Sequence, residues 1–150
     1  MMYEIDLSTL LLISEENNTT RVITYDGEFV VEENVKKIID NSCRFFGNSL
    51  ISRTKMTNNL INIVSKSPIV IEDTRNIIFF PLKSSRDKNN IWISFNNLKK
   101  YEQVNKKTLL HFKNDFDYLI DFSYYIIDNQ VTRSLMLDYE LNKRRKSLEK

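Results

Sequence analysis

The chain has 150 residues, of which 41% are hydrophobic and 28% charged, with a formal net charge of +2. This composition suits one folded domain with a core and differs from that of a disordered chain. One cysteine excludes an intrachain disulfide, and one cysteine with one histidine excludes a Cys/His zinc site within the chain.

No segment has the pattern of a membrane anchor or a leader. The longest apolar runs are about five residues, against roughly 20 for a membrane span. The first nine residues contain Glu4 and Asp6 and lack the basic start of a signal peptide. We therefore expect a cytoplasmic protein without membrane contact.

Charge is distributed unevenly along the chain. Residues 1–35 hold one basic and eight acidic residues, a net −7, whereas residues 36–107 hold fourteen basic and five acidic residues, a net +9. Residues 108–150 hold seven of each. A polyanion would meet a basic middle segment, although the charges can also mix on a solvated surface.

The first third of the chain predicts strands followed by a helix. Leu10 to Ile13 form an apolar run, and residues 20–25 and 28–32 are rich in β-branched and aromatic residues. Asp26-Gly27 between them predicts a tight hairpin in which both residues have positive φ angles. A helix is predicted over 35–46, with Asn34 as N-cap and Gly47 just past its end. The side chains expected on its apolar face are Val35, Ile38, Ile39, Ser42, Cys43 and Phe46.

A second helix is predicted from about Ser49 to Val64, bounded by Pro68. Its expected buried residues are Met56, Leu60, Ile63 and Val64. Short apolar strands follow at 69–71 and 77–80, and the polar, basic stretch 81–90 is expected to be a loop.

The last third predicts further strands and one long helix. The predicted strands are 91–95, 98–104, 108–112 and 116–121. The helix runs from Tyr124 to about Arg145, followed by a basic tail from about residue 143. Its expected apolar stripe comprises Ile127, Val131, Leu135 and Tyr139, with Leu137 and Leu141 beside it. We expect this helix either to pack on its own sheet or to mediate dimerisation.

The predicted fold class is α+β, with an antiparallel β-rich core of hairpins and two or three helices, including the long C-terminal amphipathic helix. Ile38-Ile39-Asp40-Asn41 recurs as Ile126-Ile127-Asp128-Asn129, each after a hairpin, which is compatible with duplicated hairpin-helix units. No linker divides the chain, so residues 1–150 are interpreted as a single domain.

Catalytic patterns are absent or have simpler explanations. The two glycines, Gly27 and Gly47, cannot form a dinucleotide-binding or phosphate-binding glycine loop. His111 lies within a predicted strand, and Cys43 falls on an apolar helical stripe, so both are expected to be structural. Asp115, Asp117 and Asp121 could bind a divalent ion in a nuclease, but a solvated face explains them better. We therefore expect no enzyme, no metal and no cofactor.

Basic residues remain as candidate ligand-binding groups. From Asn41 to Ile71 the chain has no acidic residue, and a helix joint with free N–H groups falls inside this segment. Cations and hydroxyls of this kind make the backbone contacts of nucleic-acid binding, and an arginine can enter a narrow A·T minor groove. The predicted DNA-binding residues are Arg44, Arg53, Lys55, Lys83, Ser84, Ser85, Arg86 and Lys88. We expect the joint and the loop 81–90 to share one face.

Phe45 or Trp92 could stack or wedge between bases, although core packing explains them better.

The chain resembles the competence transcription factor (ComK) family, and the shorter staphylococcal-type members in particular. The matching residues are Asp40, Ser42-Cys43-Arg44-Phe45-Phe46-Gly47, Ser49, Arg53, Ser65-Lys66, Pro68-Ile69, Ile77, Phe80-Pro81, Ser84-Ser85, Trp92-Ile93-Ser94, Asn129-Gln130-Val131 and Arg133. They cover roughly residues 20–145. Residues 97–125 also resemble, more faintly, the end of LytTR-type DNA-binding domains.

The resemblance implies a transcriptional activator of the genes for DNA uptake. Such a protein would bind paired A·T-rich boxes of double-stranded DNA through the minor groove, as a dimer or dimer of dimers, in association with the nucleoid. RNA polymerase and a proteolytic adaptor are further candidate partners. However, Asn89-Asn90-Ile91 replaces a Cys-Gly of longer members, and the tail that carries their adaptor signals lies beyond the resemblance. The alternative interpretation is a protein-interaction regulator that binds no DNA and whose basic surface meets an acidic partner.

Overall fold

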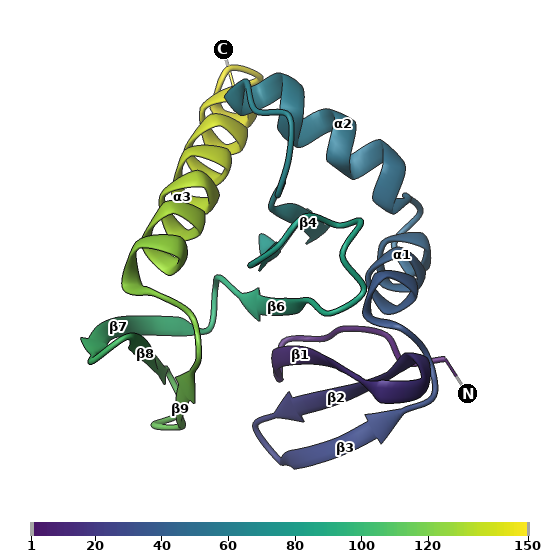
Figure 1. Cartoon of the computed structure of the whole chain (residues 1–150). Helices are drawn as coiled ribbons and strands as arrows, with labels where there is room; N and C mark the ends of the chain where they lie inside the picture. The colour runs from purple at the N-terminus through teal and green to yellow at the C-terminus, as the bar shows by residue number, and fades with distance from the viewer. Residues whose placement is uncertain (1, 150) are drawn as a thin grey trace.

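The computed structural model describes residues 2–149, which form two antiparallel sheets and three α-helices (Figure 1). The elements in order are β1 (Thr9–Glu15), a 3-10 turn (Glu16–Asn18), β2 (Thr19–Thr24), β3 (Gly27–Val31), α1 (Val35–Phe45), α2 (Leu50–Ile61), β4 (Ile69–Glu72), β5 (Ile77–Pro81), β6 (Ile91–Ser94), β7 (Leu98–Val104), β8 (Lys107–Phe112), β9 (Asp117–Ile120) and α3 (Tyr124–Lys146). The predicted α+β class, with its hairpins and long C-terminal helix, is confirmed.

The larger sheet has six strands in the order β3-β2-β1-β6-β5-β4 and carries buried hydrophobic residues on both faces. On one face, α1 and the start of α2 bury residues such as Ile38, Cys43 and Leu50 against Leu12 and Phe79. On the other face lie α3 and the three-stranded sheet β7-β8-β9. The larger sheet is therefore the middle layer, with α1 and the start of α2 on one side and the smaller sheet with α3 on the other. The end of α2 packs with α3, where Ile61 and Leu137 share a third cluster with Val70 and Ile78.

This middle position explains two strands whose residues do not alternate in polarity. Leu12 points into the core under α1, whereas Leu11 and Ile13 point into the core under the smaller sheet. In β5, Phe79 and Phe80 divide between the two cores in the same way. A strand covered on both faces needs apolar residues at every position.

The first hairpin differs in detail from the prediction. Thr24 pairs with Gly27, so Tyr25 and Asp26 form its two-residue turn. Gly27 has φ +135°, whereas Asp26 is not among the residues with positive φ. The predicted strands are confirmed, but the prediction of positive φ at both Asp26 and Gly27 is wrong, because the turn begins one residue earlier.

The helix α1 follows its sequence signals closely. The backbone N–H of Lys37 donates to Asn34 Oδ1 at 2.9 Å, which confirms the N-cap. At the other end, Gly47 has φ +84°, and the N–H groups of Gly47 and Asn48 donate to carbonyls of Arg44 and Cys43. Phe46 is exposed rather than buried, because the helix ends before it and the chain turns away.

The helix α2 is buried only partly as predicted: Met56, Leu60 and Ile63 are half-buried against the cluster of Val70, Ile78 and Leu137. Leu50, Arg53, Thr57 and Ile61 are buried, whereas Val64 lies beyond the helix and is 94% exposed. Polar residues can face inwards here because they find partners on the next segment. Thr57 Oγ1 donates to the carbonyl of Pro68 at 2.7 Å.

The helix α3 packs on its own sheet, but its predicted apolar stripe is only partly right. Ile127 and Leu137 are buried together with the polar Gln130 and Ser134. Leu135 and Tyr139 are exposed. Within residues 2–149, no helix combines the length and the hydrophobicity needed to cross a membrane.

Candidate nucleic-acid interface

The basic loop between β5 and β6 is held in shape by the buried side chain of Asn90. Asn90 Nδ2 donates to the carbonyls of Lys83 and Ser84 at 2.9 and 3.2 Å, and Oδ1 accepts from the N–H of Lys83 at 3.0 Å. The backbone of Asn90 is in turn bonded to Ser14 of β1. Because one amide satisfies both ends of the loop, its tip is presented in a defined position.

A second segment, residues 64–67, is positioned by α3. Gln130 is 2% exposed, and its Nε2 donates to the carbonyl of Lys66 at 2.8 Å and to that of Pro81 at 2.7 Å. Arg133 donates to the carbonyl of Ser65 at 2.6 Å. Lys66 has φ +53°, a strained angle for lysine that these contacts help to hold. Gln130 thus joins the segment after α2 to the end of β5.

These segments enclose a groove beside α2, which we call the basic groove. It has a volume of about 360 Å³ and is lined by Leu50, Thr54, Val64, Ser65, Lys66, Ser67, Ile69, Pro81, Ser84, Ser85, Arg86 and Trp92. Ser85 and Arg86 also line a neighbouring hollow of about 310 Å³ with Asn18, Asn34, Val35, Lys36, Asp87 and Lys88. The groove and the hollow adjoin at Ser85 and Arg86, and the hollow reaches the start of α1; we call the surface of both together the basic face.

Four cations of this face are free of carboxylate partners. Within residues 2–149, Lys36, Lys66, Arg86 and Lys88 make no ion pair. Lys83 lies 3.7 Å from Asp87, its partner on the same loop. Lys36 and Lys66 were not predicted as site residues, and only the fold brings them to the pockets that Arg86 also lines.

Arg44 lines neither the groove nor the hollow, and it is already paired. Its Nε donates to Asp40 Oδ2 at 2.8 Å, while Asp40 Oδ1 accepts the N–H of Leu50. Desolvation raises the pKa of Asp40, but the hydrogen bonds from Arg44 and Leu50 outweigh it, so the pKa lies below its ordinary value. The Arg44 side chain remains 63% exposed, so it can still reach a ligand.

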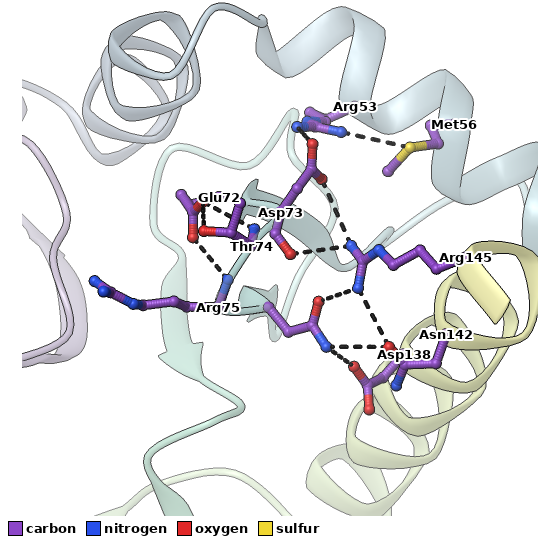
Figure 2. A network of polar contacts seen from close by, with 10 residues as sticks. Arg53, Met56, Glu72, Asp73, Thr74, Arg75, Asp138, Asn142 and Arg145 are labelled. Atoms are coloured by element: carbon purple, nitrogen blue, oxygen red, sulfur yellow. Dashed lines mark hydrogen bonds and ion pairs between the residues drawn. The ribbon is translucent and has the colours of Figure 1, made fainter. Parts of the chain in front are cut away.

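Arg53 is inside the protein rather than on its surface. The residue is 6% exposed, and its guanidinium donates to Asp73 Oδ2 at 2.9 Å and to Met56 Sδ at 3.5 Å. Its Nε has no hydrogen-bond partner among the residues described. Figure 2 shows Asp73 between Arg53 of α2 and Arg145 of α3, so that the β4–β5 turn is held by both helices. Lys55, two residues further along α2, is exposed.

The groups considered for catalysis are placed apart from the groove. His111 lies on β8 between Asp117 and Glu102, with ring nitrogens 2.7 and 2.6 Å from their carboxylates. In the described part of the chain, no group of three His, Cys, Asp or Glu side chains could hold a metal ion. Cys43 is buried as predicted, and desolvation raises the pKa of its thiol to about 12, which opposes a role as nucleophile.

The structure is that of an α+β protein with a cationic groove on its surface. Comparison with known proteins then identifies the family: the family model described as ComK protein matches residues 1–146, and the chain belongs to the ComK family. The competence transcription factor of Bacillus subtilis (strain 168) is 31% identical over 139 residues, which cover 90% of this chain and 72% of that relative. No solved structure matches the chain. This homology supports the role of a competence transcription factor rather than an enzyme.

Several residues that carry the family resemblance meet around the basic groove. Gln130 and Arg133 hold Ser65 and Lys66, and Trp92 forms part of the groove wall. These residues are far apart in the sequence, but each of them either lines the groove or holds a residue that lines it.

Proposed function

We propose that this chain is a sequence-specific DNA-binding activator of competence genes, which binds A·T-rich boxes through the basic groove. The observation that carries the proposal is a group of cations that make no ion pair within residues 2–149, namely Lys36, Lys66, Arg86 and Lys88, close to the hydroxyls of Ser84 and Ser85. Cations without carboxylate partners release counterions when they meet phosphates, which drives binding to DNA.

The groups of the basic face would have different roles. Lys36, Lys66, Lys83 and Lys88 would contact phosphates, together with the two serine hydroxyls. Arg86 lies at the boundary of the groove and the hollow, and its guanidinium would enter the minor groove, where narrow A·T tracts attract arginine. Asn90 holds Lys83 and Ser84, and the N–H of Arg86 donates to Ser84 Oγ, so these contacts would reduce the loop entropy lost on binding.

The residues at the helix joint would act at the margin. Arg44 and Lys55 are exposed and would contact the flanking backbone of the duplex. Arg53 would not touch DNA in this arrangement, because its guanidinium is buried against Asp73. Its proposed role is to position α2, which forms one wall of the groove.

Binding as a multimer is part of the same proposal. The face of α3 that points away from the sheets leaves Met136 and Tyr139 exposed, and a second copy would cover them. We propose that residues 1–150 act as one DNA-binding domain in the cytoplasm, on the nucleoid.

A gel-shift titration with A·T-rich and G·C-rich duplexes at physiological salt tests the proposal. Arg86→Ala should weaken binding to the A·T-rich duplex by about 1–3 kcal/mol, roughly 5- to 150-fold, with a smaller effect on the other duplex. The matched control is Arg75→Ala, which removes an exposed arginine that lies outside the groove and the hollow. This control should bind normally.

Three results would speak against the proposal. Unchanged binding of Arg86→Ala would remove the basic groove as the contact surface. Equal losses in Arg75→Ala would mean that only the overall charge matters. Equal, weak binding of the unaltered protein to both duplexes would favour the alternative function, a regulator that acts through an acidic protein partner.

A further inference from the structure

A second cleft lies at the edge of the larger sheet, and we call it the acidic cleft. It has a volume of about 510 Å³ and is lined by Met2, Tyr3, Phe29, Val30, Val31, Glu32, Glu33 and Lys37. The strand β3 forms one side of it and is an outer strand of the sheet. Its residues Gly27 to Val30 are all exposed, with Val30 at 56%. Exposed apolar side chains beside a cleft mark a surface that another chain can cover.

The charge of the cleft selects a basic occupant. Its lining holds two acidic residues, Glu32 and Glu33, against one basic residue, Lys37, a net −1. Lys37 is the cation of the cleft, and it lies 4.0 Å from Glu33, which neutralises it. Glu32 is exposed and makes no ion pair within the described residues. Two β3 strands paired about a two-fold axis would bring Glu28 and Glu32 of both copies together, which like-charge repulsion disfavours.

The same chain carries a surface of complementary character at the end of α3. Met136, Tyr139, Lys143 and Lys146 follow one another at intervals of three, four and three residues and therefore share one outward face. All four are exposed, and within residues 2–149 neither lysine makes an ion pair. Arg145 differs, because it is bonded to Asn76 and Asp73 (Figure 2).

Figure 1 places the C-terminal end of α3 and the strand β3 at opposite ends of the molecule. The basic end of α3 therefore cannot fill the acidic cleft of its own chain. The end of α3 from a second copy can fill the cleft instead. Met136 and Tyr139 of that helix would cover Phe29 and Val30, while its lysines would approach Glu32.

We propose that the acidic cleft of one copy binds the outward face of the end of α3 of a second copy. The contact joins two different surfaces, so each copy keeps one free cleft and one free helix end, and copies can add in a row. The inference rests on the multimer in the proposed function and deepens it, because it names both surfaces. The basic groove uses neither of them, so it stays free in such a row.

Sedimentation velocity of the full chain over a concentration series tests this arrangement, with and without an A·T-rich duplex. A cleft variant, Val30→Lys with Glu32→Lys, and a helix variant, Lys143→Glu with Lys146→Glu, should each lose the species larger than a monomer. A mixture of the two variants should form a dimer and nothing larger, since it has one intact cleft and one intact helix end. Leu119→Lys, on the exposed side of β9, is the control and should assemble as the unaltered protein does.

The mixture gives the decisive result. A dimer in the mixture supports the head-to-tail contact, whereas monomers in the mixture, or variants that still assemble alone, overturn it. An unaltered chain that stays monomeric under both conditions also overturns it and would assign the cleft to another protein. Circular dichroism checks that the variants are folded. A gel shift of the monomeric variants separates this question from DNA binding, which requires only the basic groove.

Discussion

At the scale of single residues, two buried amides determine the shape of the basic groove. Asn90 and Gln130 each donate to two backbone carbonyls. A buried amide that bridges two segments fixes their separation, and its loss leaves carbonyls unsatisfied. The cations of the groove depend on these amides for their positions.

Asn90→Asp should therefore reduce both stability and DNA binding. The change keeps the shape of the side chain but replaces the donor Nδ2 by an oxygen next to the carbonyls of Lys83 and Ser84. We expect a loss of about 1–3 kcal/mol in the free energy of unfolding, measured by urea titration. Asn89→Asp is the control, since it adds the same charge one residue earlier at an exposed position. Equal effects of the two substitutions would show that charge alone is responsible.

At the scale of elements, the three-stranded sheet contains a pH-dependent contact. His111 on β8 lies between Glu102 on β7 and Asp117 on β9. A neutral imidazole has one N–H and can donate to only one carboxylate, whereas the charged form donates to both. The hydrogen bonds to Glu102 and then to Asp117 accordingly raise the pKa of His111 above its ordinary value.

The stability of the protein should fall as the pH rises through the raised pKa of His111. In the unfolded chain this histidine titrates near 6.5, so the contribution is complete below that pH and is lost above the folded-state pKa. His111→Gln should flatten this part of the profile, because glutamine does not titrate. Urea midpoints measured from about pH 5 to 8 would show the difference. Parallel profiles for the two proteins would mean that His111 contributes nothing.

At the scale of the whole molecule, opposite charges are separated onto different surfaces. The acidic first 35 residues supply the cleft beside β3, and the basic middle of the chain supplies the groove between α2 and the loop after β5. The net charge of +2 hides this separation. A polyanion would be attracted to one face and repelled by the other, which orients the protein on DNA.

The affinity for DNA should consequently fall steeply with salt concentration. The logarithm of the binding constant should decrease linearly with the logarithm of the salt concentration, at about 0.9 per neutralised phosphate. Lys88→Ala should reduce this slope by about 1, as expected when one phosphate contact is lost. Lys113→Ala, a cation outside the groove and the hollow, should leave the slope unchanged. Identical slopes for all three proteins would exclude Lys88 as a phosphate contact.

Most helices, strands and loops could be predicted from the sequence alone, because the signals that define them are local. Asn34 and Gly47 bound α1, and the polar run 81–90 is a loop, since capping and turn preferences depend on a few adjacent residues. The buried faces of α2 and α3 were less predictable. Apolar spacing pointed to Val64 and Leu135, whereas Arg53, Thr57, Gln130 and Ser134 are buried because distant segments supply their hydrogen-bond partners.

The candidate site shows the same division. The cations and hydroxyls of the loop predicted Ser84, Ser85 and Arg86, which line the basic groove. The matching residues along the chain predicted the family to which it belongs. Only the tertiary structure could show that Arg53 is buried and that Lys36 and Lys66 lie beside Arg86. The sequence determines the type of each side chain. Whether a charged side chain faces solvent, a carboxylate or another cation depends on packing between residues far apart in the chain.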